Sequence, residues 1–395
     1  MNLLYHHRTQ GRGAEGVHIS STVKALKNIG CNVKIIGPPG IDPLTTAGDV
    51  PIDNEKLSVS GIHRIWSYVS REFPQMGFEI LELLYNIYGS IRLFYETVQR
   101  PCDGIYERYA FMLLGGFVVA KLRKIPFVLE VNEVSGVKRE RKQKMLFLTA
   151  KIESLLFKKA DHILVVSSFL QEKVIERGGD PVKVHLVPNG VDLNLFRPKI
   201  NVVFKEQLGF DNCLVLGFLG WFSKWDRLDL LVEAFSKLCK LRKDLKLVLV
   251  GTGPMIDELH NKISIMGLDD AVYMPGGVER ESVADYLSII DIGVFPDSNE
   301  FGSPISLFEL MAMGKTVVGP NLAPFLDVIS DGENGKIFKR GSVDDLVSIL
   351  QNLIDNPSEI EKIGKVARLW VEDKRSWESV AIKIEEMFRI SNEQK

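Results

Sequence analysis

The chain has 395 residues, of which 45% are hydrophobic and 25% are charged, and its formal net charge is −2 at pH 7. This length is too great for one ordinary hydrophobic core, so we expect two domains with a cleft between them. The composition excludes a disordered or membrane-spanning chain, and the near-neutral charge gives no indication of a nucleic-acid partner.

The opening residues predict a soluble protein that stays in the cytoplasm. They run directly into an apolar strand, without the charged, apolar and small-residue zones of a secretory signal. The longest apolar runs, 110–120 and 213–222, are about half of the roughly 20 residues that cross a bilayer. The four cysteines lie far apart, with no CxxC pair, so neither a zinc site nor a disulfide framework is indicated.

Strands and helices alternate through the first half of the chain. The apolar segment LLYHH is followed by a glycine turn, a helix over about 14–29 and the strand NVKII. Further strands are predicted at GIYE, PFVLEV, HILVV and VHLV, with helical stretches between them. This alternation predicts a doubly wound parallel sheet in an α/β, Rossmann-like domain over residues 1–190.

The same pattern restarts after the turn-rich segment PNGVDLNLFRP. The strands LVLGFL, LKLVLV, AVYM and DIGVF alternate with helices and predict a second Rossmann-like domain over residues 191–375. Residues 376–395 contain an amphipathic helix, which we expect to cross back to the first domain.

Three glycines near the N-terminus form a GxGxxG pattern between the first strand and the first helix. Gly11, Gly13 and Gly16 would let a ligand approach the N-terminus of that helix. A dinucleotide site also needs an acid at the end of the second strand, but Asp42 lies beyond two prolines. A tight turn without a ligand is the alternative interpretation.

A stronger candidate site lies in FPDSNEFGSPISLFELMAMGKTVVG, where a strand ending at Phe295 leads through a loop to a helix. We expect Pro304 at the first helical position and Ser303 as its N-cap. The N–H groups of Ile305 and Ser306 would then face the loop, where they suit a phosphate group.

Two acids accompany this helix. Glu309 lies about one turn into it, within reach of a ribose, and Glu300 lies on the loop before it, within reach of a sugar. A helix-surface charge and a loop charge are the alternative interpretation of this pair.

The segment resembles the donor site of the retaining glycosyltransferases of family 4. Members of that family have a glutamate, seven residues, a second glutamate and then A-M-A-x-G-x-P-V-V, and here Glu309 is followed by LMAMGKTVV. PNGVD at 188–192, VGTGP at 250–254 and DIGVFP at 291–296 also resemble the family. The resemblance therefore extends over most of the chain.

The resemblance implies a GT-B fold, in which two Rossmann-like domains face a cleft and a nucleoside diphosphate sugar binds the second domain. It implies that Glu309 binds the ribose of the donor and that Glu300 contacts the sugar. The start of the helix would hold the diphosphate, and the loop PGGV at 275–278 would lie beside the base. The donor-binding candidates are Gly13, Gly251, Gly253, Pro254, Gly277, Val278, Phe301, Gly302, Ser303, Pro304, Ile305, Ser306 and Glu309.

This chain departs from the family pattern at several positions. Counting back from Glu309 with the family's spacing places Phe301 at the position of the first glutamate. Glu300 fills that role only if the loop shifts by one residue. The family's arginine and lysine after the first strand of the second domain correspond here to Trp221 and Asp226.

Lys224 and Arg227 are the nearest substitutes for this basic pair. A departing diphosphate needs positive charge, so we expect at least one of them to be indispensable, and solvated surface bases are the alternative. The histidine that the family places near the reacting sugar is Asn132 here, which can hydrogen-bond a hydroxyl but cannot take a proton. The catalytic candidates are therefore Glu300, Lys224, Arg227 and Asn132.

The first domain carries the candidates for acceptor binding. YERY at 106–109 and EVNE at 130–133 are similar to a subgroup of the family. The acceptor candidates are Arg12, Glu15, His18, Glu107, Arg108 and Glu133. Buried structural ion pairs are the alternative. His6 and His7 have no partner at metal spacing, so we interpret them as a polar strand end.

No DxD triplet occurs in the sequence, so the usual carboxylate clamp for a metal-bridged diphosphate is absent. Helix N–H groups and a base would hold the phosphates instead. We therefore expect no metal and no cofactor, with a UDP-sugar as the first expectation for the co-substrate and a GDP-sugar as the second.

The segment 137–159 is basic at both ends and carries Met145, Leu148, Ile152, Leu155 and Leu156 on one helical face. A basic amphipathic helix of this kind predicts peripheral contact with the anionic inner face of a membrane. A core-packed helix with a solvated basic face is the alternative.

These features together predict a retaining transferase that moves a hexosyl unit from a nucleoside diphosphate sugar to a hydroxyl of a glycan, lipid-linked or small-molecule acceptor, in polysaccharide or glycoconjugate biosynthesis. Two other functions stay open. A nucleotide-sugar isomerase acting at C2 would consume donor without an acceptor. A catalytically degenerate nucleotide-sugar-binding protein would bind nucleotide without turnover.

Overall fold

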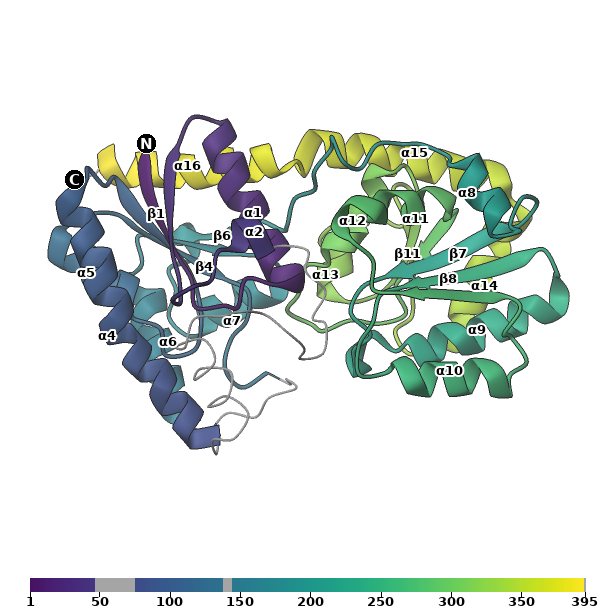
Figure 1. The fold of residues 1–395 in the computed structure, drawn as a ribbon, viewed down its shortest axis with the longest axis horizontal. Coiled ribbons are helices and arrows are strands. Elements are labelled where there is room, and N and C mark those ends of the chain that lie inside the picture. Colours follow the sequence, from purple (N-terminus) through teal and green to yellow (C-terminus); the bar gives the residue numbers. More distant parts are fainter. Residues whose placement is uncertain (47–74, 138–143, 394–395) are drawn as a thin grey trace. The chain divides into compact units, whose positions relative to one another are not determined.

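The computed structural model describes residues 1–46, 75–137 and 144–393 (Figure 1). The chain divides into two compact units, one formed by Met1–Pro188 with Trp377–Lys395 and the other by Asn189–Ser376. Each unit contains a six-stranded sheet whose neighbouring strands are parallel. The alternation of strands and helices predicted for both halves of the chain is therefore confirmed.

The sheet of the first unit has the strand order β2-β1-β3-β4-β5-β6. Its strands are β1 (Asn2–His6), β2 (Asn32–Ile36), β3 (Gly104–Arg108), β4 (Phe127–Val131), β5 (His162–Val165) and β6 (Val184–Leu186). Every residue of β3 and β4 is buried, because helices cover both faces of a parallel sheet. These two strands therefore show no alternation of buried and exposed residues.

The helices of the first unit lie on two sides of this sheet (Figure 1). They are α1 (Gly13–Asn28), α2 (Pro43–Thr46), α4 (Gln75–Gln99), α5 (Gly115–Arg123), α6 (Leu146–Lys159), α7 (Ser168–Glu176), the 3₁₀ turn η1 (Pro181–Lys183) and α16 (Trp377–Glu393). Right-handed crossovers put α1 on one face and α4, α5, α6 and α7 on the other. The C-terminal helix α16 packs against α1 and β4.

The sheet of the second unit has the order β12-β11-β10-β7-β8-β9. Its strands are β7 (Leu214–Leu219), β8 (Leu245–Val250), β9 (Val272–Gly276), β10 (Ile292–Val294), β11 (Thr316–Pro320) and β12 (Lys336–Phe338). One continuous core of buried aliphatic and aromatic side chains joins this sheet to its helices, with Phe235, Phe308 and Phe325 among the side chains that are fully buried.

Helices and short 3₁₀ turns connect these strands. They are α8 (Val202–Gln207), η2 (Lys224–Asp226), α9 (Leu228–Leu241), α10 (Ile256–Ile265), η3 (Arg280–Ser282), α11 (Val283–Ile289), α12 (Ile305–Ala312), α13 (Ala323–Leu326), α14 (Val343–Asp355) and α15 (Pro357–Lys374). In the described part of the chain, no helix combines the length and the apolar character that spanning a membrane requires.

One close contact joins α16 to the sheet of the first unit. Phe388 of α16 is fully buried, and a Cβ atom added to Gly104 of β3 would lie 2.3 Å from its ring. A glycine is therefore needed where the strand passes beneath this ring.

Replacing Phe388 by alanine tests this packing. We expect Phe388→Ala to lower the free energy of unfolding of the first unit by about 3–5 kcal/mol, because it leaves a cavity beneath α16. Urea denaturation followed by circular dichroism measures the loss. Ile382→Ala on the same helix is the control, since Ile382 is 53% exposed. Equal effects of the two substitutions would contradict the proposed role of Phe388.

Candidate functional site

The strand order reverses once in each sheet. In the second unit, the chain goes from β7 to β8 and β9 on one side, and from β10 to β11 and β12 on the other. In the first unit, the corresponding reversal lies between β1 and β3. Loops diverge at the carboxyl ends of the strands at such a point and leave room for a ligand. Many of the candidate residues lie after these strands, whereas Glu107 and Arg108 lie in β3 itself.

The start of α12 differs from the expectation. Pro304 is the N-cap residue and Ile305 is the first helical residue, so the prediction of Pro304 at the first helical position with Ser303 as cap is wrong by one residue. Ser303 instead accepts a hydrogen bond at its Oγ from the N–H of Asn189, at 3.1 Å. No side chain caps α12, so the N–H groups of Ile305 and Ser306 stay available to an anion.

Glu309 lies on the first turns of α12 and is 1% exposed. Its carboxylate has a cationic partner that the sequence analysis did not find, because Nη2 of Arg280 lies 2.5 Å from its Oε1. Oε1 accepts no well-oriented hydrogen bond from the described residues, so the contact is an ion pair. Arg280 lies two residues after the loop at 275–278, and its guanidinium also lies over the ring of Phe196.

Glu300 also has an arginine partner, on the loop after β12. Arg340 Nη1 lies 3.0 Å from Glu300 Oε1, and its Nε donates to Asp297 Oδ1 at 2.8 Å. Asp297 and the neighbouring Ser298 are buried, whereas the Glu300 side chain is 52% exposed. Arg340 therefore fixes the loop between β10 and α12, while Glu300 stays accessible at its surface.

The two substitute bases have different surroundings. Arg227 binds Asp229 through two hydrogen bonds, from Nε and Nη2, at 2.9 and 3.1 Å. Lys224 is exposed and has no ion-pair partner within the described residues. Asp226, which stands at one of the family's basic positions, closes η2 by accepting the N–H of Ser223 at 3.0 Å. Trp221, at the other basic position, is 45% exposed.

Two predicted donor glycines have a clear packing role. A Cβ atom at Gly251 would lie 1.9 Å from the carbonyl oxygen of Gly220, and one at Gly253 would lie 2.6 Å from the nitrogen of Phe222. The N–H of Phe222 donates to Thr252 at 2.9 Å, which joins the loops after β7 and β8. Only glycine permits this close approach.

The remaining donor candidates lie on loops of the second unit, except for Gly13. Gly277 and Pro254 are exposed, and Val278 is half-buried against the core. Phe301 and Gly302 are half-buried in the loop before α12. Gly13 belongs to the first unit, where it opens α1 with a φ of 56°.

In the first unit, a buried carboxylate gathers three of the predicted residues. Glu130, at 0% exposure, accepts hydrogen bonds from Arg108 Nη1 at 2.6 Å and from Asn132 Nδ2. His18 Nε2 lies 3.4 Å from the same carboxylate, and Tyr106 donates to it at 2.6 Å. The segment EVNE is visible in the sequence, but nothing there indicates the role of Glu130, because a strand residue gives no sign of its cross-strand partners.

Charges around Glu130 keep it ionised. Burial alone would raise its pKa, but the charges of His18 and Arg108 and the hydrogen bonds from Tyr106 and Asn132 lower the pKa below its usual value. The network thus contains a permanent carboxylate with a permanent guanidinium beside it.

Glu107 lies apart from this network, although it neighbours Arg108 in β3. Successive side chains of a strand point to opposite faces. Glu107 Oε2 lies 2.5 Å from His6 Nδ1 and accepts the N–H of Gly116 at 2.8 Å. Burial and then the charges of His6 and Arg108 lower the pKa of the neighbouring His7 to about 3, so this histidine is neutral.

The other acceptor candidates lie at loop and helix starts. Arg12 is the N-cap of α1, where Glu15 is exposed in the first turn. Glu133 is half-buried in the loop after β4.

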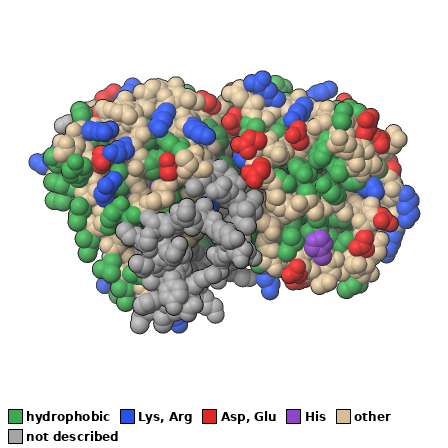
Figure 2. All heavy atoms as spheres, in the orientation of Figure 1, with side chains coloured by type: hydrophobic (Ala, Val, Ile, Leu, Met, Phe, Trp, Pro, Cys, Tyr) green, Lys and Arg blue, Asp and Glu red, His purple; other side chains and the backbone are tan. Residues whose placement is uncertain are grey.

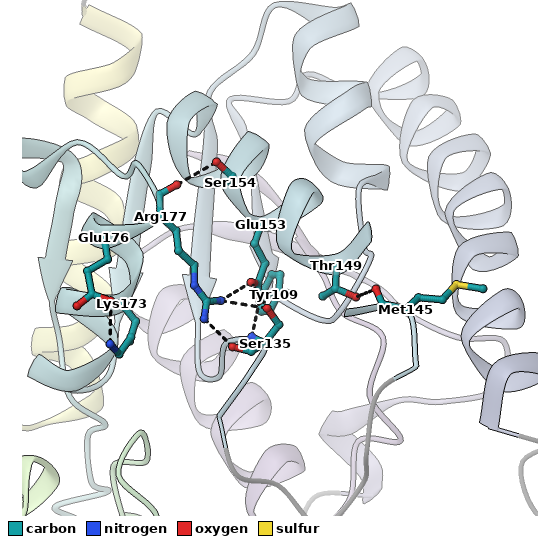
Figure 3. Close-up of polar contacts among 9 residues, drawn as sticks. All are labelled: Tyr109, Ser135, Met145, Thr149, Glu153, Ser154, Lys173, Glu176 and Arg177. Atoms are coloured by element: carbon teal, nitrogen blue, oxygen red, sulfur yellow. Dashed lines mark hydrogen bonds and ion pairs between the residues drawn. The ribbon is translucent and has the colours of Figure 1, made fainter. Parts of the chain in front are cut away.

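A second buried carboxylate fixes the loop that carries Asn132 and Glu133 (Figure 3). Glu153 of α6 accepts hydrogen bonds from Tyr109 at 2.7 Å and from the N–H and Oγ of Ser135 at 2.7 and 2.5 Å. Arg177 completes the cluster by donating to Glu153 and to the carbonyl of Ser135.

The parts of the chain that the structure describes contain no group of three His, Cys, Asp or Glu side chains that could hold a metal ion.

Comparisons with known proteins agree with both halves of the chain. Residues 15–195 match the family described as Glycosyltransferase Family 4, and residues 203–370 match the one described as Glycosyl transferases group 1. An uncharacterised glycosyltransferase of Methanocaldococcus jannaschii is 25% identical over 75% of this chain and 77% of its own length. D-inositol 3-phosphate glycosyltransferase of Paenarthrobacter aurescens is 24% identical over 94% of this chain and 92% of its own length.

The fold also resembles solved structures. HepE of Anabaena, in complex with UDP-glucose, superposes with a TM-score of 0.72 at 17% identity, covering 98% of this chain and 99% of that one. At this identity the likeness concerns the fold, which is the GT-B type that the sequence analysis expects.

The Glu130 network gives a prediction for pH dependence. Glu130→Gln leaves Arg108 buried without its counter-charge, so we expect a loss of about 3–5 kcal/mol in the free energy of unfolding at pH 7. Because the pKa of Glu130 is lowered by folding, its ionisation stabilises the protein fully above the ordinary glutamate pKa of about 4.3, and this stabilisation is lost as the pH falls through the lowered pKa.

The difference between wild type and Glu130→Gln should therefore be constant near neutral pH and shrink in acid. Urea denaturation at a series of pH values measures it. A difference that grows on acidification would contradict an ionised Glu130.

Proposed function

The chain belongs to the family 4 and group 1 glycosyltransferases and has the GT-B fold, and from this premise we propose that it moves a hexosyl unit from a nucleoside diphosphate sugar to an acceptor hydroxyl with retention of configuration. The acceptor belongs to a glycan, a lipid carrier or a small molecule. The sugar product then enters polysaccharide or glycoconjugate biosynthesis.

The observation that carries this proposal is the uncapped start of α12 at the strand-order reversal of the second unit. The N–H groups of Ile305 and Ser306 bind the donor diphosphate. Glu309, whose charge Arg280 balances, binds the ribose hydroxyls. Glu300, held through Arg340, contacts the donor sugar.

Positive charge on η2 stabilises the departing diphosphate. Lys224 is the stronger of the two candidates, because its ammonium has no ion-pair partner in the described part of the chain. Arg227 already binds Asp229 with two hydrogen bonds and contributes by its remaining donors. The backbone and these bases together hold the diphosphate without a metal ion.

The residues around Glu130 prepare the first unit for the acceptor. Asn132 and Arg108 are both bound to this carboxylate, which fixes their side chains. Asn132 hydrogen-bonds a sugar hydroxyl near the reacting carbon. Arg12, Glu15, His18, Glu107 and Glu133 stay acceptor candidates of the proposal.

The donor is a UDP-sugar in this proposal, with a GDP-sugar as the second choice. Its support is the likeness in fold to a protein solved with UDP-glucose.

The proposal also includes a cytoplasmic location and contact of the segment 137–159 with the inner face of a membrane. Residues 138–143 of this segment lie outside the described residues. In α6, Ile152 and Leu156 are buried, whereas Leu148 and Leu155 are exposed, so the apolar residues expected on one face divide between core and surface. Lys151, over the ring of Phe147, is the kind of basic group that favours an anionic surface.

Nucleotide binding gives the first test. We expect one of UDP, GDP, ADP, TDP and CMP, and UDP before the others, to raise the melting temperature, since a ligand at about 100 times its Kd adds about 2.7 kcal/mol to the stability of the native state. The shift should be the same with and without EDTA. If no nucleotide stabilises the protein, or only a chelator-sensitive one does, the metal-free donor site is refuted.

Turnover with the matching nucleotide sugar tests the leaving-group charge. We expect Lys224→Ala with Arg227→Ala to lower kcat by about 10²-fold or more, as for the loss of an oxyanion donor. Lys237→Ala is the control, because this exposed lysine pairs with the exposed Asp344 and lies outside the candidate site. Wild-type turnover of the double variant would exclude this role.

Two outcomes of the same assay separate the other functions. Consumption of donor without an acceptor, with formation of an isomeric nucleotide sugar, would favour the isomerase. Binding of nucleotide with no turnover in any acceptor mixture would favour a degenerate binding protein.

A further inference from the structure

Helix α4 has the opposite polarity from an ordinary surface helix. Its three acids, Glu79, Glu82 and Glu96, are all buried, at 1%, 8% and 5% exposure. Glu96 pairs with Nζ of Lys34 at 2.7 Å, and Glu79 accepts the backbone N–H groups that open α6 at 2.7 Å. The acidic side of this helix therefore faces the protein, and an apolar side is left outward.

The outward side of α4 is a continuous hydrophobic stripe. Its exposed residues recur every three or four positions, which is one face of a helix. They are Ile80, Leu84, Ile87, Ile91, Phe94, Tyr95 and Val98. Val118 and Leu122 of α5, which packs against α4, are exposed as well. We call these nine residues the apolar face, and Figure 2 shows hydrophobic side chains gathered on the surface over α4 and α5.

Basic side chains accompany the apolar face; among them, Lys121 of α5 pairs with Asp161 at 3.4 Å. Arg92 and Arg100 are exposed on and after α4, and Arg123 and Lys124 at the end of α5. The Arg123 guanidinium lies 5.8 Å from the ring centroid of Phe94. Helix α5 contains no acid, and those of α4 are buried. In a chain with 51 acids and 49 bases, this local separation of charge indicates an anionic partner.

We propose that the apolar face docks on the surface of an anionic lipid bilayer. Hydrophobic side chains such as Ile91, 65% exposed, enter the boundary between headgroups and acyl chains. The arginines contact lipid phosphates, and Phe94 and Tyr95 lie at the headgroup level, where amphipathic rings are stable. Helix α4 lies along the membrane plane and does not cross it.

A second copy of this chain fits the apolar face less well. The spacing of the stripe suits a helix pair, but two identical faces would bring Arg92, Arg100, Arg123 and Lys124 against their own copies without a carboxylate to balance them. A bilayer that contains anionic lipid supplies this balance. The docking depends on α4 and α5 and is independent of transferase activity.

Vesicle flotation of the full chain tests the proposal. Wild type should float with phosphatidylcholine vesicles that contain about 30 mol% phosphatidylglycerol, and much less with phosphatidylcholine alone. Ile87→Glu with Ile91→Glu should lower binding by about tenfold or more, because two charges enter the apolar face. Both positions are more than half exposed, so we expect folding to be kept, which circular dichroism checks.

Val182→Glu with Ile265→Glu is the matched control. These side chains are 82% and 86% exposed on other elements, and the change in charge is the same. This variant should bind vesicles nearly as wild type does. Arg92→Ser with Arg100→Ser should lower binding to the anionic vesicles specifically.

Three results would overturn the proposal. One is absence of wild-type binding to both kinds of vesicle, and another is equal loss in the control and in the Ile87→Glu, Ile91→Glu variant. The third is a wild-type dimer, seen by light scattering, that this variant converts to a monomer, since the apolar face would then bind a second copy.

Discussion

The first turn of α12 has backbone N–H groups that no side chain caps, because Pro304 occupies the N-cap position. The surrounding residues keep this helix end open. Asn189 holds Ser303 by two hydrogen bonds, so the hydroxyl that could have capped the helix is already engaged. Arg340 holds the preceding loop through Asp297 and Glu300. The reversal of strand order between β7 and β10 then leaves room for a ligand beside it.

Arginine–carboxylate pairs fix the candidate residues in both units. Arg280 balances Glu309 in the second unit, and Arg108 balances Glu130 in the first. Buried pairs of this kind contribute little net stability, but removing one partner is costly. Their value here is that they hold each carboxylate in one orientation before a ligand arrives.

The sequence predicts the strands well, because apolar runs with helical stretches between them are a local signal. It also locates the start of α12 to within one residue and places Glu309 on its first turns, since both lie within one motif. It does not predict Arg280 or Arg340, which lie 29 and 40 positions from the glutamates they bind, since pairing at that separation depends on the fold. Nor does the sequence predict that the acids of α4 are buried, because periodicity does not say which side of a helix faces the core.

The most direct test of the central claim removes one N–H group from α12. Pro304 is already extended, with φ −63° and ψ 117°, so Ile305→Pro fits the first helical position and takes away only the backbone donor and the side chain. Ile305→Ala keeps the donor. Calorimetric titration with the stabilising nucleoside diphosphate should give a Kd about tenfold weaker for the proline variant than for the alanine variant. Equal affinities would contradict diphosphate binding at this helix.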